Sequence, residues 1–255
     1  MGVYDDNSAM YVKMLFISSK TLDEIADALV SNNIAIKIFD LKQNDLLKLL
    51  DDTKPAAFKI IYDLFEDKDK FVHVHINDEP IIFYLVKTQK KNILNEILHD
   101  IVHYKSSINS SWCGANVMHM LCYYHYYNLI IKLHKLDNEL ISTPDACGYT
   151  PFDLLLIKTA KQTIICGDLV KIIKMIDIDI YQKLLNNKIM NSSKHNYRFG
   201  SILNDPIGLN FIDIIERNIS SSNNNDEQQK RGLYQTIMKH ICDVMMPLKI
   251  ELKNN

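Results

Sequence analysis

The chain has 255 residues, of which 47% are hydrophobic and 24% charged, proportions close to those of ordinary globular domains. This composition excludes a wholly disordered chain and a disulfide-dense miniprotein, and 7 Gly and 6 Pro are few for a many-stranded β protein. Lys plus Arg number 29 against 31 Asp plus Glu, so the net charge of -2 provides no overall attraction to nucleic acid. We therefore expect an all-α protein without a nucleic-acid partner.

The cysteines and the start of the chain bear on its location. The five cysteines are not in CxxC pairs, and the first residues lack the basic and apolar regions of a secretory leader. No apolar stretch reaches the roughly 18 uncharged residues that a membrane-spanning helix needs. These features predict reduced thiols, a cytoplasmic location and no membrane association.

Local signals divide the chain into short amphipathic helices. Thr21 and Glu24 have the spacing of a capping box, Asn44 or Asp45 can cap the helix that follows, and Pro55 suits a first helical turn. Further helices are expected at 56–65, 92–102, 117–125, 128–136, 151–161, 168–176, 208–217 and 230–246. A weak extended pair is expected at 12–17 and 71–76.

One short pattern recurs along the chain. Residues 114–121 recur 34 positions later at 148–155 and again at 208–215. Each copy reads Gly, any residue, Thr or Asn, apolar or Pro, apolar, His or Asp, and two apolar residues. The Gly permits a turn with positive φ, Thr or Asn can cap the helix, and Pro in its first turn loses no hydrogen bond. A repeat of this length predicts short helical hairpins that stack to bury a shared core.

The pattern resembles the ankyrin repeat, whose signature is D-x-x-G-x-T-P-L-H-x-A over about 33 residues. Residues 145–153 match that signature at its Asp, Gly, Thr and Pro but have Asp153 in place of His. The copy at 114 keeps the His, as His119, and lacks Thr-Pro. Residues 128–133 and 167–174 resemble second helices, and the second of these comes late, which indicates a longer first helix or an inserted loop at 159–166.

The resemblance implies an ankyrin-like solenoid of stacked helix-turn-helix repeats with short inter-repeat fingers. Residues 75–246 would form this array, including a degenerate copy at 78–98 and a flexible polar loop at 218–229. Residues 1–74 would form an N-terminal helical segment of capping or degenerate repeats, one of them at 40–65, and residues 247–255 a tail. Residues 178–207 fit worst and hold either a divergent repeat or an insertion.

The resemblance also implies a binding surface, since ankyrin proteins hold partners with finger tips and the inner side of first helices. Transferred residue by residue, these positions predict partner-binding roles for Trp112, Ala115, Tyr123, Tyr124, Tyr149, Lys158 and Arg217, with Ala146, Ile157 and Leu209 at the same kind of position. Trp, Tyr and Arg are the residues that dominate interface hot spots. Tyr126 and Tyr127 either join this surface or pack between helices.

Two chemical alternatives compete with a pure binding role. Cys113, His119, Cys122 and His125 lie close enough in sequence for a zinc site, but no second Cys/His pair completes a standard spacing. A nucleophilic pair of Cys113 or Cys242 with His119 or His240 is open, although no recognised catalytic motif surrounds it. Inert buried thiols are the favoured interpretation.

These observations predict a non-catalytic protein–protein interaction module without cofactor or metal. The degenerate repeats and the Asn-, Ile- and Lys-rich composition are reminiscent of ankyrin proteins of large DNA viruses and intracellular bacteria. By that analogy the protein is a host-directed effector that binds a host protein, in the cytoplasm or the host-cell cytosol. The alternative is an enzyme or toxin-like domain at 1–74 that the repeats carry to its target. The sequence predicts no oligomeric state.

Overall fold

The computed structural model describes residues 6–18, 20–38, 41–77, 79–106, 114–160 and 167–190, and eight isolated positions further on: Ile212, Asp213, Gly232, Gln235, Met238, Lys239, Cys242 and Asp243. The described part is mostly helical with two short strands, as the composition predicts. The chain divides into two compact units, residues 1–102 and residues 103–255. These units are defined by packing, whereas the boundary expected after residue 74 marks where the repeat pattern begins in the sequence. That boundary therefore stays a prediction.

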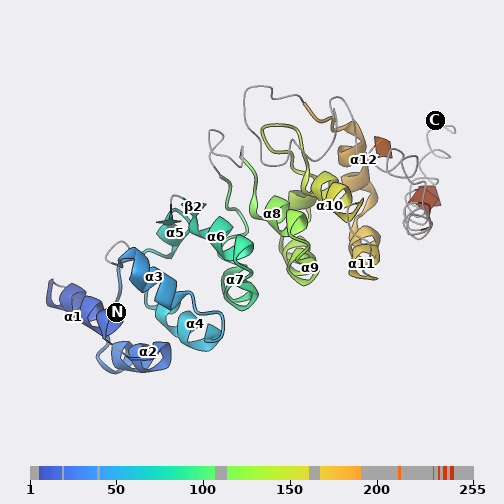
Figure 1. Ribbon diagram of the computed structural model, residues 1–255. Coiled ribbons are helices and arrows are strands. Elements are labelled where there is room, and N and C mark those ends of the chain that lie inside the picture. The colour runs from blue at the N-terminus through green and yellow to red at the C-terminus, as the bar shows by residue number, and fades with distance from the viewer. Residues whose placement is uncertain are drawn as a thin grey trace. The chain divides into compact units, whose positions relative to one another are not determined.

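The first unit consists of helices arranged in consecutive pairs, joined by turns and a small hairpin (Figure 1). Its helices are α1 (Asp6–Ile17), α2 (Leu22–Ser31), α3 (Gln43–Leu49), α4 (Pro55–Asp63), α5 (Lys68–Phe71), α6 (Ile81–Lys87) and α7 (Lys91–Ile97). Helix α1 packs against α2 and α3, whereas α4 packs against α2 before it and α7 after it. Each pair therefore buries its apolar side chains against the next, as short helices require.

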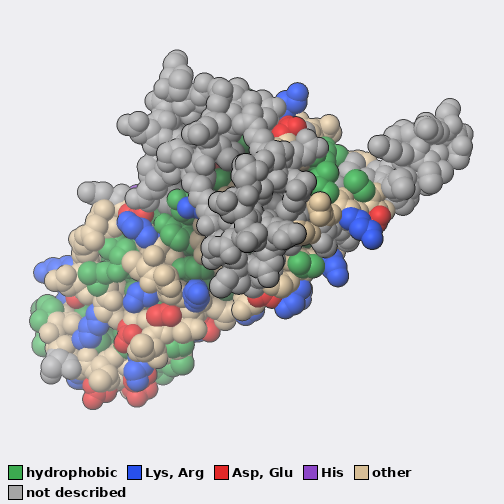
Figure 2. Space-filling view, turned by 45° about the vertical axis from the view of Figure 1, so that its right-hand side comes forward, with side chains coloured by type: hydrophobic (Ala, Val, Ile, Leu, Met, Phe, Trp, Pro, Cys, Tyr) green, Lys and Arg blue, Asp and Glu red, His purple; other side chains and the backbone are tan. Residues whose placement is uncertain are grey.

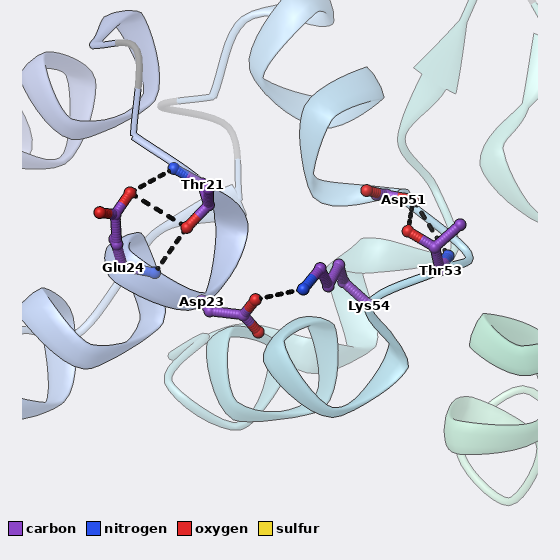
Figure 3. Close-up of polar contacts among 6 residues, drawn as sticks. All are labelled: Thr21, Asp23, Glu24, Asp51, Thr53 and Lys54. Atoms are coloured by element: carbon purple, nitrogen blue, oxygen red, sulfur yellow. Dashed lines mark hydrogen bonds and ion pairs between the residues drawn. The ribbon is translucent and has the colours of Figure 1, made fainter.

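The local signals explain where several of these helices begin. The Thr21 hydroxyl accepts a hydrogen bond from the Glu24 backbone N–H at 3.3 Å, and the Glu24 carboxylate accepts one from the Thr21 backbone N–H at 2.7 Å, which confirms the capping box (Figure 3). Pro55 is the first residue of α4, as predicted. The Lys54 ammonium lies 2.6 Å from the Asp23 carboxylate, so an ion pair joins the start of α4 to α2.

Two local predictions in this unit are wrong. Residues 12–17 belong to α1 and not to a strand, because Val12, Leu15 and Phe16 form a helical stripe buried against α2 and α3. Helix α3 is capped at Lys42, whose backbone N–H donates to the Asp45 carboxylate at 2.9 Å, and not at residues 44 or 45.

A cluster of aromatic rings and a hairpin fill the space after α4. The Tyr62 ring lies 5.6 Å from that of Phe58 and 5.3 Å from that of Phe71, in stacked and edge-on arrangements. The expected extended segment at 71–76 is confirmed only at its end, where strand β1 (His75–Ile76) pairs antiparallel with β2 (Glu79–Pro80). Ile76 is opposite Glu79, and β2 leads directly into α6.

The second unit repeats the arrangement of paired helices (Figure 1). It contains α8 (Val117–Tyr123), α9 (Tyr127–Leu136), the 3-10 helix η2 (Glu139–Ser142), α10 (Pro151–Ala160), α11 (Gly167–Met175) and α12 (Ile178–Asn186). Helix α8 packs against α10, and α9 packs against α11, so first helices lie beside first helices and second beside second. The ten residues of α10 against the seven of α8 agree with the longer first helix that the late second helix indicated. The predicted helices at 208–217 and 230–246 and the polar loop at 218–229 lie almost wholly outside the described residues.

Candidate protein-binding surface

The recurring pattern forms the same turn in both of its described copies. Gly114 has φ 75° and Gly148 has φ 85°, a left-handed conformation that favours glycine. Two residues after each Gly, Asn116 caps α8 and Thr150 lies directly before α10. The third copy, at Gly208, lies outside the described residues.

Each cap is closed in both directions. The Asn116 side chain accepts a hydrogen bond from the His119 backbone N–H at 3.0 Å, and the His119 ring accepts one from the Asn116 backbone N–H at 3.1 Å. At α10, the Thr150 hydroxyl accepts from the Asp153 backbone N–H at 3.1 Å, and the Asp153 carboxylate accepts from the Thr150 backbone N–H at 2.8 Å. Thus Asn and Thr cap the first helices, as predicted, and His119 and Asp153 have equivalent places.

His119 connects the two helix pairs. Its Nε2 lies 2.8 Å from the carbonyl oxygen of Tyr149 at the end of the next finger. With Nδ1 accepting from Asn116, the tautomer that satisfies both contacts carries its proton on Nε2. Complete burial lowers the pKa of His119 to about 3, so the ring is neutral. His119 thus holds two successive helix pairs of the second unit in register.

These contacts bear on the zinc and nucleophile alternatives. Both ring nitrogens of His119 are engaged, and in the described part of the chain no group of three or more His, Cys, Asp or Glu side chains is placed to hold a metal ion. Cys122 is buried, and burial raises the pKa of its thiol far above the usual range, which disfavours the reactive thiolate. Cys113 and His240 lie outside the described residues.

Three of the predicted binding residues come together at the ends of α8 and α10. The Tyr123 and Tyr124 rings meet edge to face with centroids 5.1 Å apart. The Lys158 ammonium of α10 lies 3.7 Å from the centroid of the Tyr123 ring, in a cation–π contact between neighbouring first helices. All three side chains are half-buried and so partly open to a partner. We call Tyr123, Tyr124 and Lys158 the tyrosine–lysine surface.

Two other predicted binding residues are buried, which corrects their assignment as surface contacts. Ala115 is 0% exposed and its carbonyl accepts from the backbone N–H of Ser106, within the finger before α8. Tyr149 is 4% exposed, since its backbone binds Asp145 and His119 on either side. Both residues hold the fingers together and are not available to a partner.

The remaining positions are divided between surface, core and undescribed chain. Ala146 is exposed at the turn of its finger, whereas Ile157 is buried within α10. Trp112, Arg217 and Leu209 lie outside the described residues, so their predicted roles stay predictions.

The other tyrosines of this region have mixed environments. Tyr126 is buried, with its ring 6.3 Å from that of Tyr124, which favours packing between helices for this residue. Tyr127 is half-buried and stacks on His125 with centroids 5.6 Å apart.

A turn that the sequence does not reveal precedes Tyr126. His125 has φ 59° and ends α8 in the left-handed conformation, and Gln89 does the same after α6 with φ 62°. In both turns the N–H of the next residue donates to a carbonyl five positions back, Tyr126 to Leu121 and Lys90 to Leu85. The usual signal for such a turn is Gly, and neither position has one.

A cavity of about 470 Å³ lies between η2 and α12, lined among others by Glu139, Ser142, Thr143 and Lys183. Both hydroxyls donate to the backbone carbonyl of Glu139 at 3.0 Å, and Lys183 is ion-paired with the Glu139 carboxylate. This arrangement uses the polar groups of the cavity in local structure.

The chain matches no protein-family model, and neither a curated protein nor a solved structure matches it. None of the described helices is both long enough and apolar enough to cross a membrane. Figure 2 shows Lys and Arg side chains interspersed with Asp and Glu over the described part of one face.

Proposed function

We propose that this protein is a non-catalytic protein–protein interaction module, built as an ankyrin-like solenoid of stacked helical hairpins. The observation that carries the proposal is the repetition of a left-handed Gly and a two-way cap in two consecutive helix pairs, which the hydrogen bond from His119 to the Tyr149 carbonyl joins. Repeats of this kind bury a core only by stacking, and they leave one row of first helices free to vary for recognition.

Cross-pair hydrogen bonds support the same proposal in both units. Gln43 donates to Asn77, which lies 34 residues away, and Asn92 contacts Asp52 across 40 residues. In the second unit Asn138 contacts Asp177 across 39 residues. These separations are close to one repeat length, as nearest-neighbour stacking requires.

The tyrosine–lysine surface is the part of the second unit best suited to bind a partner. Tyr123 and Tyr124 offer large rings with few rotatable bonds, and the contact with Lys158 restricts the Tyr123 ring before any partner binds. Side chains that are already ordered lose little conformational entropy on binding. We expect them to provide the central contacts of the interface.

By analogy with ankyrin proteins of large DNA viruses and intracellular bacteria, the partner would be a host protein and the site of action the cytoplasm or the host-cell cytosol. Degenerate repeats and the Asn-, Ile- and Lys-rich composition support this part of the proposal. We propose no enzymatic activity, because the His119 imidazole and the Ser142 hydroxyl are held in structural hydrogen bonds and burial disfavours the thiolate form of Cys122.

The test is capture of partners from a eukaryotic lysate with three forms of the full chain. The wild-type protein should retain a discrete set of proteins, and the Tyr123→Ala/Lys158→Ala double variant should lose them. Lys174→Ala, an exposed lysine on the second-helix row, should retain them and serves as the matched control. If a double variant with a native circular dichroism spectrum keeps every protein that the wild type keeps, the surface is wrongly placed.

A further inference from the structure

The carboxylate of Asp153 lies in the first turn of α10 and is almost completely buried. Asp153 is 2% exposed, and its Oδ2 accepts hydrogen bonds from the backbone N–H of Thr150 at 2.8 Å and from the Thr150 hydroxyl at 2.7 Å. In the described part of the chain no Lys, Arg or His forms an ion pair with it. A buried carboxylate without a cation is costly to ionise.

The groups that face Asp153 do not offset this cost. The finger before α10 contributes Asp145, a second buried carboxylate, and Tyr149, whose pKa burial raises. Helix α8 contributes His119, which is neutral and bound to the Tyr149 carbonyl, and Cys122, whose pKa is raised by burial so that its thiol is also neutral. Helix α12 contributes Tyr181, whose hydroxyl donates to the Ile173 carbonyl. The charge nearest to Asp153 is therefore negative.

Burial raises the pKa of Asp153 to about 7, and the charge of Asp145 adds to this, while the two hydrogen bonds from Thr150 only partly oppose it. The carboxyl group is thus poised to gain or lose a proton near neutral pH. In the preceding helix pair the equivalent position holds His119, which stays neutral throughout this range.

We propose that Asp153 is a proton-uptake site that makes the second unit more resistant to unfolding as the pH falls through the neutral range. The neutral acid needs no cation, and it removes the buried charge at the cap of α10, which lies next to the carboxylate of Asp145 in the finger. The helix-cap position that holds the neutral His119 in α8 thus holds a proton-sensitive side chain, Asp153, in α10.

The direction follows from linkage. An unfolded Asp releases its proton near pH 3.8, whereas folded Asp153 releases it near 7. Between these values the folded state holds a proton that the unfolded state has lost, so the contribution of Asp153 to stability is largest at low pH. It is lost as the pH rises through 7, by up to about tenfold in the folding equilibrium constant for each pH unit.

His119 contributes in the opposite direction below pH 6.5, because its folded pKa lies below its unfolded pKa. The stability of the wild-type protein alone therefore mixes two opposed effects. The comparison of Asp153→Asn with the wild type isolates one of them, since Asn can accept the same backbone hydrogen bond and does not titrate.

The experiment measures urea unfolding of the full chain at pH 5, 6, 7 and 8, with hydrogen exchange of the α10 amides as the local readout. Relative to the wild type, the folding equilibrium constant of Asp153→Asn should rise by roughly a hundredfold from pH 5 to pH 8. Parallel pH curves for the two proteins would overturn the proposal.

A matched control and a direct titration complete the test. Asp45→Asn makes the same exchange at the same helix position in α3, and it measures what the exchange costs in a cap. Carbon-13 NMR of the wild-type carboxyl groups needs no variant to fold: one resonance should titrate close to pH 7. If every carboxyl resonance titrates below pH 5, Asp153 is not a proton-uptake site.

Discussion

The carboxylate of Asp52 accepts a hydrogen bond from the backbone N–H of Asn92 at 3.0 Å, although the two residues are 40 positions apart. The same carboxylate oxygen accepts from the N–H of Ile93, also at 3.0 Å. These are two of the N–H groups in the first turn of α7 that lack a partner within the helix. The loop between α3 and α4 thus caps a helix of the next pair.

We predict that Asp52→Ala lowers the free energy of unfolding by about 0.5–2 kcal/mol, the usual value of a helix cap. The neighbouring Asp51 is the control, because its carboxylate accepts hydrogen bonds from Thr53 within the same loop (Figure 3). Urea unfolding of the two variants should show the larger loss for Asp52→Ala. Equal losses would mean that the hydrogen bonds from α7 to Asp52 contribute no more stability than the local hydrogen bonds of Asp51.

Gly148 provides a second test of the stacked arrangement. It has φ 85°, and a Cβ there would lie 2.8 Å from the backbone oxygen of Lys188 and 2.8 Å from the backbone nitrogen of Met190. We predict that Gly148→Ala destabilises the second unit by about 2–4 kcal/mol, from backbone strain and steric overlap.

Gly167→Ala is the control for this substitution. Apart from its chain neighbours and the backbone of its own helix, no atom of the described residues lies within 4 Å of the position that its Cβ would take, at the first residue of α11. This variant should be unchanged or more stable by about 0.4–1 kcal/mol. Thermal unfolding that shifts equally in both variants would contradict the close approach of residues 188–190 to the finger.

Substitutions in α1 can distinguish a helix from a strand at residues 12–17. Val12 is 1% exposed and Met14 is 61% exposed, although a strand would place residues two apart on the same face. Val12→Ala should therefore cost about 1.5–3 kcal/mol, the value of a buried valine side chain, while Met14→Ala changes stability by less than about 0.5 kcal/mol. Similar losses for both variants in urea unfolding would favour the strand.

Features that depend on residues within one turn of each other could be predicted from the sequence. The caps at Thr21, Asn116 and Thr150 and the proline at the start of α10 are of this kind, because donor and acceptor lie at most three residues apart. The apolar spacing likewise indicated helices at α2, α4, α7, α8, α9, α10 and α11, whereas residues 12–17 of α1 were wrongly predicted as extended.

Features set by tertiary packing could not be predicted. Nothing in the residue types at His125 or Gln89 indicates a left-handed turn, and nothing near Asp52 indicates that its partner lies 40 residues ahead. Similarly, a resemblance locates Ala115 and Tyr149 in a finger but does not show that the finger covers them. Only the packed neighbours decide exposure, and among the described binding positions the tyrosine–lysine surface and Ala146 remain open.

The hydrogen bond from His119 to Tyr149 makes the strongest prediction about the repeat interface. His119→Ala would leave the Asn116 backbone N–H and the Tyr149 carbonyl buried without this partner, and it would open a cavity between α8 and α10. We expect a loss of about 2–4 kcal/mol. His134→Ala is the control, because His134 contacts the Met175 carbonyl at a longer 3.3 Å and should cost less.

The pKa of His119 also predicts how the stability of the protein changes at acid pH. Since burial holds the folded pKa of His119 at about 3, against 6.5 unfolded, its contribution is complete above pH 6.5 and is lost as the pH falls toward 3. The difference in unfolding free energy between wild type and His119→Ala should therefore shrink steadily below pH 6.5. A difference that stays constant from pH 7 to pH 4 would show that the imidazole is not held neutral, and the interface would then depend on packing alone.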